Sequence, residues 1–206
     1  MARARRLARR ALPFGVVPVD VFEWRSTNEI PNPTEAQDLS IRRLSPEDLS
    51  AREVLPKNQS KVVDSFLARG DHGYVATVGD RFAGWVWLSR VSHRDPASGL
   101  HIRLASDEAY AYAMKVEKAH RQRGIAGVLM ARLLSDVRND PKISRVYGWV
   151  DRRNRKMQFM LRMMFGFTQV QHVWRAHIPR VGWQVPWSDT PKFGPVSRVG
   201  RHSTVA

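Results

Sequence analysis

The sequence contains no cysteine among its 206 residues. The protein therefore has no disulfide framework, no thiolate metal site and no cysteine nucleophile, which fits a reducing compartment. Long apolar runs are also missing. The best stretch, residues 11–19, carries two prolines and is far shorter than the roughly 20 residues that cross a bilayer as a helix. A secretory signal would need a longer apolar core followed by a small-residue cleavage site. We therefore expect a cytoplasmic protein, at most peripheral to the inner face of a membrane.

Acidic residues are scarce relative to basic ones, with 19 Asp and Glu against 34 Lys and Arg and a formal net charge of +15. Such a charge predicts attraction to anions, whether nucleic acid, an acidic membrane face or a polyphosphate-bearing cofactor. Residues 1–10 alone hold five arginines and no acid. We interpret residues 1–17 as a basic N-terminal arm that, if helical, could lie on anionic lipid; a solvated terminus is the alternative.

The rest of the composition is typical of a globular domain, with 43% hydrophobic and 26% charged residues. Residues 18–178 alternate strand and helix patterns, whereas residues 179–206 show neither period and are expected to form an irregular C-terminal tail. Periodicity and turn signals predict strands over 18–25, 40–44, 72–78, 81–91, 108–116, 144–150 and 167–178, and helices beginning at 45 and over 61–69, 124–137 and 157–165. This order is typical of an α/β fold of the α+β type, with a mixed, largely antiparallel central sheet flanked by helices.

A β-hairpin is predicted where Gly79 and Asp80 separate two of these strands, and the residue types indicate a type I′ turn. Trp85 and Trp87 alternate onto one face of the second strand, where we expect at least one of them in the core. The polar stretch 92–107 that follows is irregular apart from a short extended piece at 100–104, and it could cover a site.

The most informative stretch is residues 109–134, which pass from a strand period through a basic turn into a helix period. A helix that opens at Gly124 leaves its first N–H groups unpaired, and Arg121 and Arg123 add positive charge beside them. The residues that would present these donors are Arg121, Gln122, Arg123, Gly124, Ile125, Ala126 and Gly127. The stretch lacks both GxxxxGK[ST] and GxGxxG. We therefore interpret it as a metal-free pyrophosphate site, with a solvated helix start as the alternative.

The motif Val116-x-x-x-x-Arg121-x-x-Gly124-Ile125-Ala126 resembles the acyl-CoA-binding signature of the GNAT N-acetyltransferase superfamily. Asn154, followed by a helix and Gly166-Phe167, resembles the downstream part of the family pattern. The resemblance covers residues 40–178. It implies a splayed strand pair, in which the strand over 108–116 diverges from the strand over 144–150 and the thioester of acetyl-CoA or another acyl-CoA lies in the opening.

The resemblance also assigns residues to parts of the cofactor. It implies that the backbone of Met114 and Val116 binds the pantetheine arm and that the N–H groups of residues 122–127 hold the pyrophosphate. Asn154 would lie beside the pantetheine, and the arginines that flank it, Arg152, Arg153 and Arg155, are the candidates to meet the 3′-phosphate.

Three features depart from the family pattern. Lys118 stands where the family often has proline, and the spacing from Asn154 to Gly166 is one residue longer than usual. Arg162 replaces the tyrosine that many members carry four residues before the glycine as proton donor to the departing thiolate. The chemistry therefore needs a different acid, or none.

Acyl transfer requires a base for the ammonium proton of the acceptor and donors to the oxyanion. Strand alternation predicts that Glu108, Tyr110, Tyr112, Met114 and Val116 share one face. We take Glu108, acting through water, as the candidate base and a tyrosine, Tyr110 or Tyr112, as the candidate acid. The alternative is that both tyrosines only pack the splayed strands.

The sequence thus predicts an N-acyltransferase that moves an acetyl or other acyl group from acyl-CoA to a primary amine of a small molecule or protein in a ternary complex. No metal is expected, because the histidines His93, His101 and His120 show no metal-ligand spacing. One alternative is a basic nucleic-acid-binding protein, although no helix-turn-helix, zinc-finger or RNA-binding motif is present. The other is a GNAT-like domain that binds CoA without catalysis, as Arg162 suggests. The sequence also leaves open a homodimer.

Overall fold

A computed structural model of the chain describes residues 15–32, 38–44, 55–56, 59–94, 101–178 and 183–188. The strands of the main sheet are β1 (Gly15–Arg25), β2 (Leu39–Leu44), β3 (His72–Val78), β4 (Arg81–Ser89), β7 (Glu108–Val116), β8 (Arg145–Asp151), β9 (Thr168–Ile178) and β10 (Trp183–Ser188). A small second sheet consists of β5 (His93–Arg94) and β6 (His101–Ile102). The helical segments are α3 (Ser60–Ala68), η2 (Lys118–His120), α4 (Ile125–Arg138), α5 (Arg155–Phe159) and the π-helical η3 (Met160–Met164).

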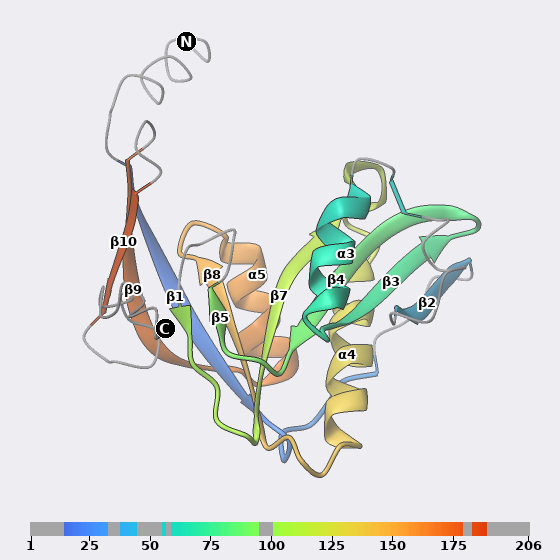
Figure 1. The fold of residues 1–206 in the computed structure, drawn as a ribbon. Coiled ribbons are helices and arrows are strands. Elements are labelled where there is room, and N and C mark those ends of the chain that lie inside the picture. The colour runs from blue at the N-terminus through green and yellow to red at the C-terminus, as the bar shows by residue number, and fades with distance from the viewer. Residues whose placement is uncertain are drawn as a thin grey trace, which may run out of the picture.

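The main sheet has eight strands in the order β10-β9-β1-β8-β7-β4-β3-β2 (Figure 1). All neighbours pair antiparallel except β7 and β8, which are parallel. Helices α4 and α5 lie on one face and α3 on the other (Figure 1). This arrangement confirms the predicted mixed, largely antiparallel sheet flanked by helices. None of the described helices is long and apolar enough to span a bilayer.

Each face of the sheet carries its own apolar cluster. The α4-side cluster packs Ile125, Leu129 and Leu133, one stripe of α4, against the sheet. The α3-side cluster contains Trp85 and Trp87, which are 5% and 0% exposed, with ring centroids 6.2 Å apart. Both tryptophans therefore belong to the core, as the sequence predicted for at least one of them.

Strand β1 lies inside the sheet, between β8 and β9 and antiparallel to both. Strands β8 and β9 follow each other along the chain, yet β1 separates them in space. The strand begins at Gly15, three residues before the predicted start at 18. At the other end, β10 pairs with β9, so the expectation that the tail has no strand is wrong for 183–188. Residues 1–14 of the basic arm and the helix expected to begin at 45 lie outside the described residues.

The turn between β3 and β4 differs from the predicted type I′. Only Gly79 has a positive φ, at 56°, whereas a type I′ turn needs positive φ at both central residues. A positive φ at the first central position alone is typical of a type II′ turn, which favours glycine there. The order Gly79-Asp80 fits this geometry.

Candidate active site

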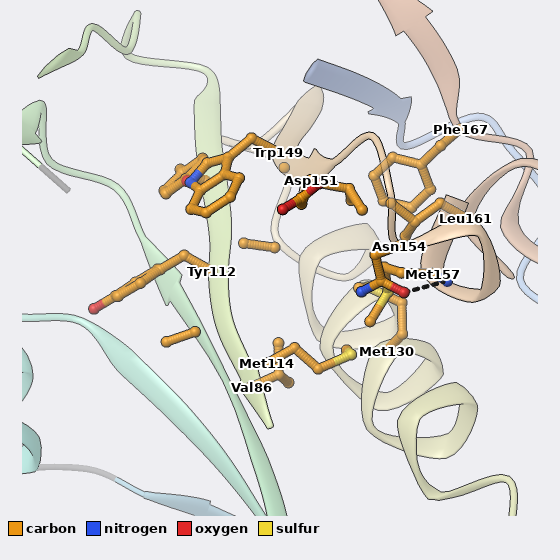
Figure 2. Close-up of a pocket in the computed structure, with 15 residues that line it drawn as sticks. Val86, Tyr112, Met114, Met130, Trp149, Asp151, Asn154, Met157, Leu161 and Phe167 are labelled. Carbon is orange, nitrogen blue, oxygen red and sulfur yellow. Dashed lines mark hydrogen bonds between the residues drawn. The ribbon is translucent and has the colours of Figure 1, made fainter. Parts of the chain in front are cut away.

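Strands β7 and β8 pair over a short length and then diverge. Their parallel ladder joins Glu108–Tyr110 to Arg145–Tyr147, and it ends there (Figure 1). Beyond Tyr110, the edge of β7 that faces β8 has no strand partner among the described residues. The opening between the two strands holds a cavity of about 280 Å³. Its lining residues are Val86, Tyr110, Ala111, Tyr112, Ala113, Met114, Met130, Gly148, Trp149, Val150, Asp151, Asn154, Met157, Leu161 and Phe167 (Figure 2).

A β-bulge at Ala113 changes which side chains of β7 face the same way. Ala113 has φ +50°, and two residues of β7, Ala113 and Met114, lie opposite one residue of β4, Val86, because Tyr112 pairs with Trp87 and Lys115 with Trp85. Before the bulge, Tyr110 and Tyr112 belong to the α3-side cluster. After it, Met114 and Val116 pack against the α4-side cluster. The prediction that Met114 and Val116 share a face with Tyr110 and Tyr112 is therefore wrong, because the bulge inserts a residue into the period of two.

The basic turn lies between β7 and α4. Gln122 has φ +67° and Gly124, the N-cap of α4, has φ +73°. The carbonyl of Gly124 accepts from the N–H groups of Gly127 and Val128, which begins the helix, so the N–H groups before Gly127 have no intrahelical acceptor. Residues 121–124 are exposed. Exposed N–H groups without an intrahelical acceptor suit an anion. The positive φ of Gln122 is a strained conformation for a non-glycine residue, and such strain gathers at functional sites.

Arginines hold this turn in place. The Nε of Arg121 donates to the carbonyl oxygen of Val116 at 3.2 Å, which links the turn to the end of β7. The guanidinium of Arg123 forms an ion pair with Asp38 at 3.0 Å, and both side chains are substantially exposed. Two positive groups thus remain beside the first turn of α4, whose dipole also favours negative charge.

Asn154 lies across the opening from β7. It is the N-cap of α5, its Oδ1 accepts from the N–H of Met157 at 3.3 Å, and it lines the cavity (Figure 2). Helix α5 continues directly into the π-helical segment Met160–Met164, and Gly166 with φ +67° follows. A π-bulge accommodates one extra residue in a helix. It accounts for the spacing from Asn154 to Gly166, which is one residue longer than the common pattern.

The hydroxyl of Tyr112 belongs to a buried ionic network. It donates to Oδ2 of Asp71 at 2.6 Å and accepts from Arg69 at 2.7 Å, and Arg69 Nε also donates to Asp71 at 2.8 Å. Burial, and then the hydrogen bond to Asp71, raise the pKa of Tyr112 well above its ordinary value. The Tyr112 proton is therefore held by Asp71, on the side of β7 away from Met130 and Met157 (Figure 2). Asp71 and Arg69 are residues that sequence reasoning missed, because their contact with Tyr112 spans about forty residues of chain.

Glu108 lies where β7 and β8 are still paired and is not among the cavity-lining residues. It is 2% exposed. One carboxylate oxygen accepts from the N–H of Ala105 at 2.9 Å. The other lies 3.4 Å from Arg145 and 3.3 Å from the hydroxyl of Tyr147, which donates its shorter hydrogen bond, of 2.8 Å, to Glu23. A proton from the cavity would reach this carboxylate only through a water or a neighbouring hydroxyl. Tyr110, in contrast, is buried and lines the cavity directly.

Most of the other arginines considered from the sequence form contacts with residues of the protein itself. Arg152 lies 3.5 Å from Asp20, and Arg153 forms a bidentate pair with Asp151. Arg162 donates to Gln169 and its guanidinium lies 5.3 Å from the centroid of Phe22, outside the cavity lining.

The cavity also contains residues that sequence reasoning did not select. Trp149 and Asp151 follow Tyr147 at intervals of two along β8. Their partners on β1 are Val21 for Trp149 and Val19 for Asp151, and both valines belong to the α3-side cluster. Strand period alone could have placed them in the opening once β8 was assigned. In the part of the chain that the structure describes, no group of histidine, aspartate and glutamate side chains could hold a metal.

Comparison with known proteins agrees with this architecture. The model of the acetyltransferase (GNAT) family matches residues 36–167, more than half of the chain. The protein therefore belongs to the GNAT acetyltransferase family. A search of curated proteins finds no match.

Solved structures share the fold at low sequence identity. A tandem GNAT protein from the clavulanic acid biosynthesis pathway superposes with a TM-score of 0.57 and 15% identity, over 92% of this chain and 59% of that one. A GCN5-related N-acetyltransferase from Sphaerobacter thermophilus gives 0.53 and 14%, over 94% and 58%. A protein of unknown function from Staphylococcus epidermidis gives 0.53 and 11%, over 84% and 65%. The chain thus spans about six-tenths of the length of these proteins.

Proposed function

We propose that this protein is an acyl-CoA-dependent N-acyltransferase that moves an acyl group to a primary amine. The observation that carries the proposal is the cavity between the diverging strands β7 and β8. It brings together four of the residues predicted from sequence, Tyr110, Tyr112, Met114 and Asn154, in a protein of the GNAT acetyltransferase family.

In this proposal different parts of the site bind different parts of acyl-CoA. The N–H groups at the start of α4, with Arg121 and Arg123 beside them, hold the pyrophosphate. The unpaired edges of β7 and β8 bind the amides of the pantetheine arm as an added strand would, and Asn154 lies beside that arm. No metal is needed, because helix N–H groups and guanidinium groups supply the charge.

The chemistry requires an amine, freed of its ammonium proton, to attack the thioester carbonyl, after which the tetrahedral intermediate expels CoA thiolate. We place the oxyanion donors at the bulge, where Ala113 and Met114 line the cavity and have no paired residue in either described neighbouring strand. The proposed base remains Glu108, reached through a water.

Protonation of the leaving group is less demanding than in many acyl transfers. A thiol has a pKa of about 8.5, so CoA leaves readily as a thiolate that water can protonate. The position of the usual tyrosine holds Arg162, which is bound to Gln169, and the Tyr112 proton is bound to Asp71. Tyr110 is the remaining candidate acid among the described cavity residues.

Binding of CoA without catalysis is a second candidate, favoured by the occupied oxygens of Glu108 and by Arg162 in place of a tyrosine. A measurement of thiol release separates the two. Thiol release from acetyl-CoA that depends on an added amine supports the transferase, whereas tight CoA binding with no amine-dependent release across simple amines, amino sugars and peptides supports the second candidate.

The binding half of the proposal can be tested with a matched pair of variants. Gly124→Glu places a carboxylate at the expected pyrophosphate position, and Gly70→Glu places one just after α3, on the other face of the sheet. Both glycines have positive φ and open space around the added Cβ, so the strain is similar. Calorimetric titration with acetyl-CoA should show micromolar binding to the wild type and to Gly70→Glu, and at least tenfold weaker binding to Gly124→Glu. Equal binding by both variants would contradict the site.

A further inference from the structure

The cavity between β7 and β8 has two chemically different parts. Polar groups line one part, namely the backbone edges of β7 and β8 together with Asp151 and Asn154. The other part, which we call the cavity floor, is formed by Val86, Met130, Met157, Leu161 and Phe167. None of these five side chains carries an N–H or O–H donor or a carbonyl or carboxylate acceptor.

The cavity floor lies within the α4-side core. Val86, Met130, Leu161 and Phe167 are at most 5% exposed, and Met157 packs against the same cluster. Protein interiors are packed as densely as organic crystals, so a large apolar hole is unusual. The polar part and the floor together have a volume of about 280 Å³, and an engineered apolar cavity of about 150 Å³ is enough to take up benzene. An apolar ligand group that enters the cavity floor should therefore be stabilised there.

The pantetheine arm does not suit the cavity floor, because its two amides and its hydroxyl need hydrogen-bond partners. Those partners are on the strand edges, where β7 beyond Tyr110 has no neighbour among the described strands. An acetyl group is a single methyl beyond the carbonyl and would leave most of the apolar surface uncovered. The chemistry of the floor thus matches a hydrocarbon chain attached to the thioester.

We propose that the natural donor is an acyl-CoA with an acyl chain longer than acetyl, and that the cavity floor binds this chain. This inference rests on the proposed acyl-CoA site and specifies its substrate. Met130 and Met157 adapt to different chain lengths, because methionine is unbranched and flexible. The π-helical segment Met160–Met164 supplies Leu161 to the wall and gives that wall an irregular helix, a feature found often at functional sites.

The test is a calorimetric titration of the wild type with CoA, acetyl-CoA, butyryl-CoA, hexanoyl-CoA and octanoyl-CoA. Each methylene that becomes buried should tighten binding by about fourfold, the ratio that corresponds to about 0.8 kcal/mol. Butyryl-CoA should therefore bind at least tenfold more tightly than acetyl-CoA, and the gain should stop when the floor is full. Affinities that agree within twofold across the series, or that weaken with length, would overturn the inference while leaving the proposed function intact. Absence of CoA and acyl-CoA binding would overturn both.

A second experiment uses substitutions that fill the cavity floor. Val86 on β4 belongs to the cavity floor and to the α4-side cluster, so Val86→Phe extends into the floor and Val86→Leu is a milder filling from the same position. Ala68→Leu, at an exposed position of α3, is the matched control. Each filling variant that melts cooperatively should keep wild-type affinity for CoA and lose the preference for butyryl-CoA and hexanoyl-CoA, whereas the control should keep both. An undiminished preference in the folded filling variants would overturn the inference.

Discussion

Replacement of Tyr112 by phenylalanine should destabilise the fold without removing a proton donor. The Tyr112 hydroxyl joins β7 to Asp71 and Arg69 through hydrogen bonds of 2.6 Å and 2.7 Å. Tyr112 is 6% exposed and Asp71 is 1% exposed, so solvent cannot replace the lost bond. The phenylalanine ring would keep the edge contact with Phe66 and the stack on Tyr110, at centroid separations of 5.1 Å and 5.7 Å.

The expected magnitude follows from the charged partner. A hydrogen bond to a charged group contributes about 1.5–3 kcal/mol, so Tyr112→Phe should lower the free energy of unfolding by about 2 kcal/mol. For a chain of this size, that corresponds to a decrease in melting temperature of about 4–8 °C. Because Asp71 is the shared partner, the effects of Tyr112→Phe and Asp71→Asn should not add in the double variant.

Urea unfolding followed by tryptophan fluorescence measures these free energies for the wild type, both single variants and the double variant. The same proteins are then assayed for thiol release from acyl-CoA with an accepted amine. We expect less than a fivefold change in rate for Tyr112→Phe. Additive free energies, or a loss below about 0.5 kcal/mol, would refute the network. A rate decrease of about 10²-fold or more, the contribution of a general acid, would refute the assignment of the proton to Asp71.

Three further predictions concern the fold. Burial raises the pKa of Tyr74, Tyr112 and Tyr147. The folded state then keeps protons that the unfolded state loses above about pH 10. The free energy of unfolding is therefore at its full value below that pH and falls by about 1.4 kcal/mol per pH unit above it for each tyrosine. Urea midpoints that stay constant from pH 9 to 11 would contradict this. Gly84→Ala should cost about 1–3 kcal/mol, because its Cβ would lie 2.5 Å from the backbone oxygen of Lys115. Gly127→Ala should cost less, because its Cβ would lie 3.7 Å from Met164, an ordinary contact; comparison of the two melting temperatures checks the order. Deletion of residues 15–25 should abolish cooperative urea unfolding, because it removes β1 from between β8 and β9; a sharp transition would show that this strand is dispensable.

Local patterns in the sequence predicted the strand–turn–helix unit well. The change from a period of two to a period of three and four located β7 and α4, and Gly124 marked the helix start. These features are set by neighbouring residues, so sequence is sufficient for them. The extra residue between Asn154 and Gly166 was also visible, although only the structure shows that a π-helical segment absorbs it.

Features that depend on distant partners were not predictable in the same way. Alanine rarely adopts positive φ, so nothing in the sequence around Ala113 marks the bulge that turns Met114 and Val116 to the α4 side. The strand pattern of β1 was visible, but its place between β8 and β9 is decided by long-range pairing. The cavity floor likewise draws its residues from β4, α4 and the α5 region, which only the fold brings together.

The central claim, that acyl-CoA binds between β7 and β8 with its pyrophosphate at the start of α4, is tested most directly by amide NMR. A titration of the isotope-labelled protein with CoA should shift the N–H signals of Ile125, Ala126 and Gly127, those of residues 111–116 on β7, and that of Asn154, while signals of α3 stay in place. Absence of shifts at millimolar CoA, or shifts confined to basic residues outside this opening, would contradict the claim.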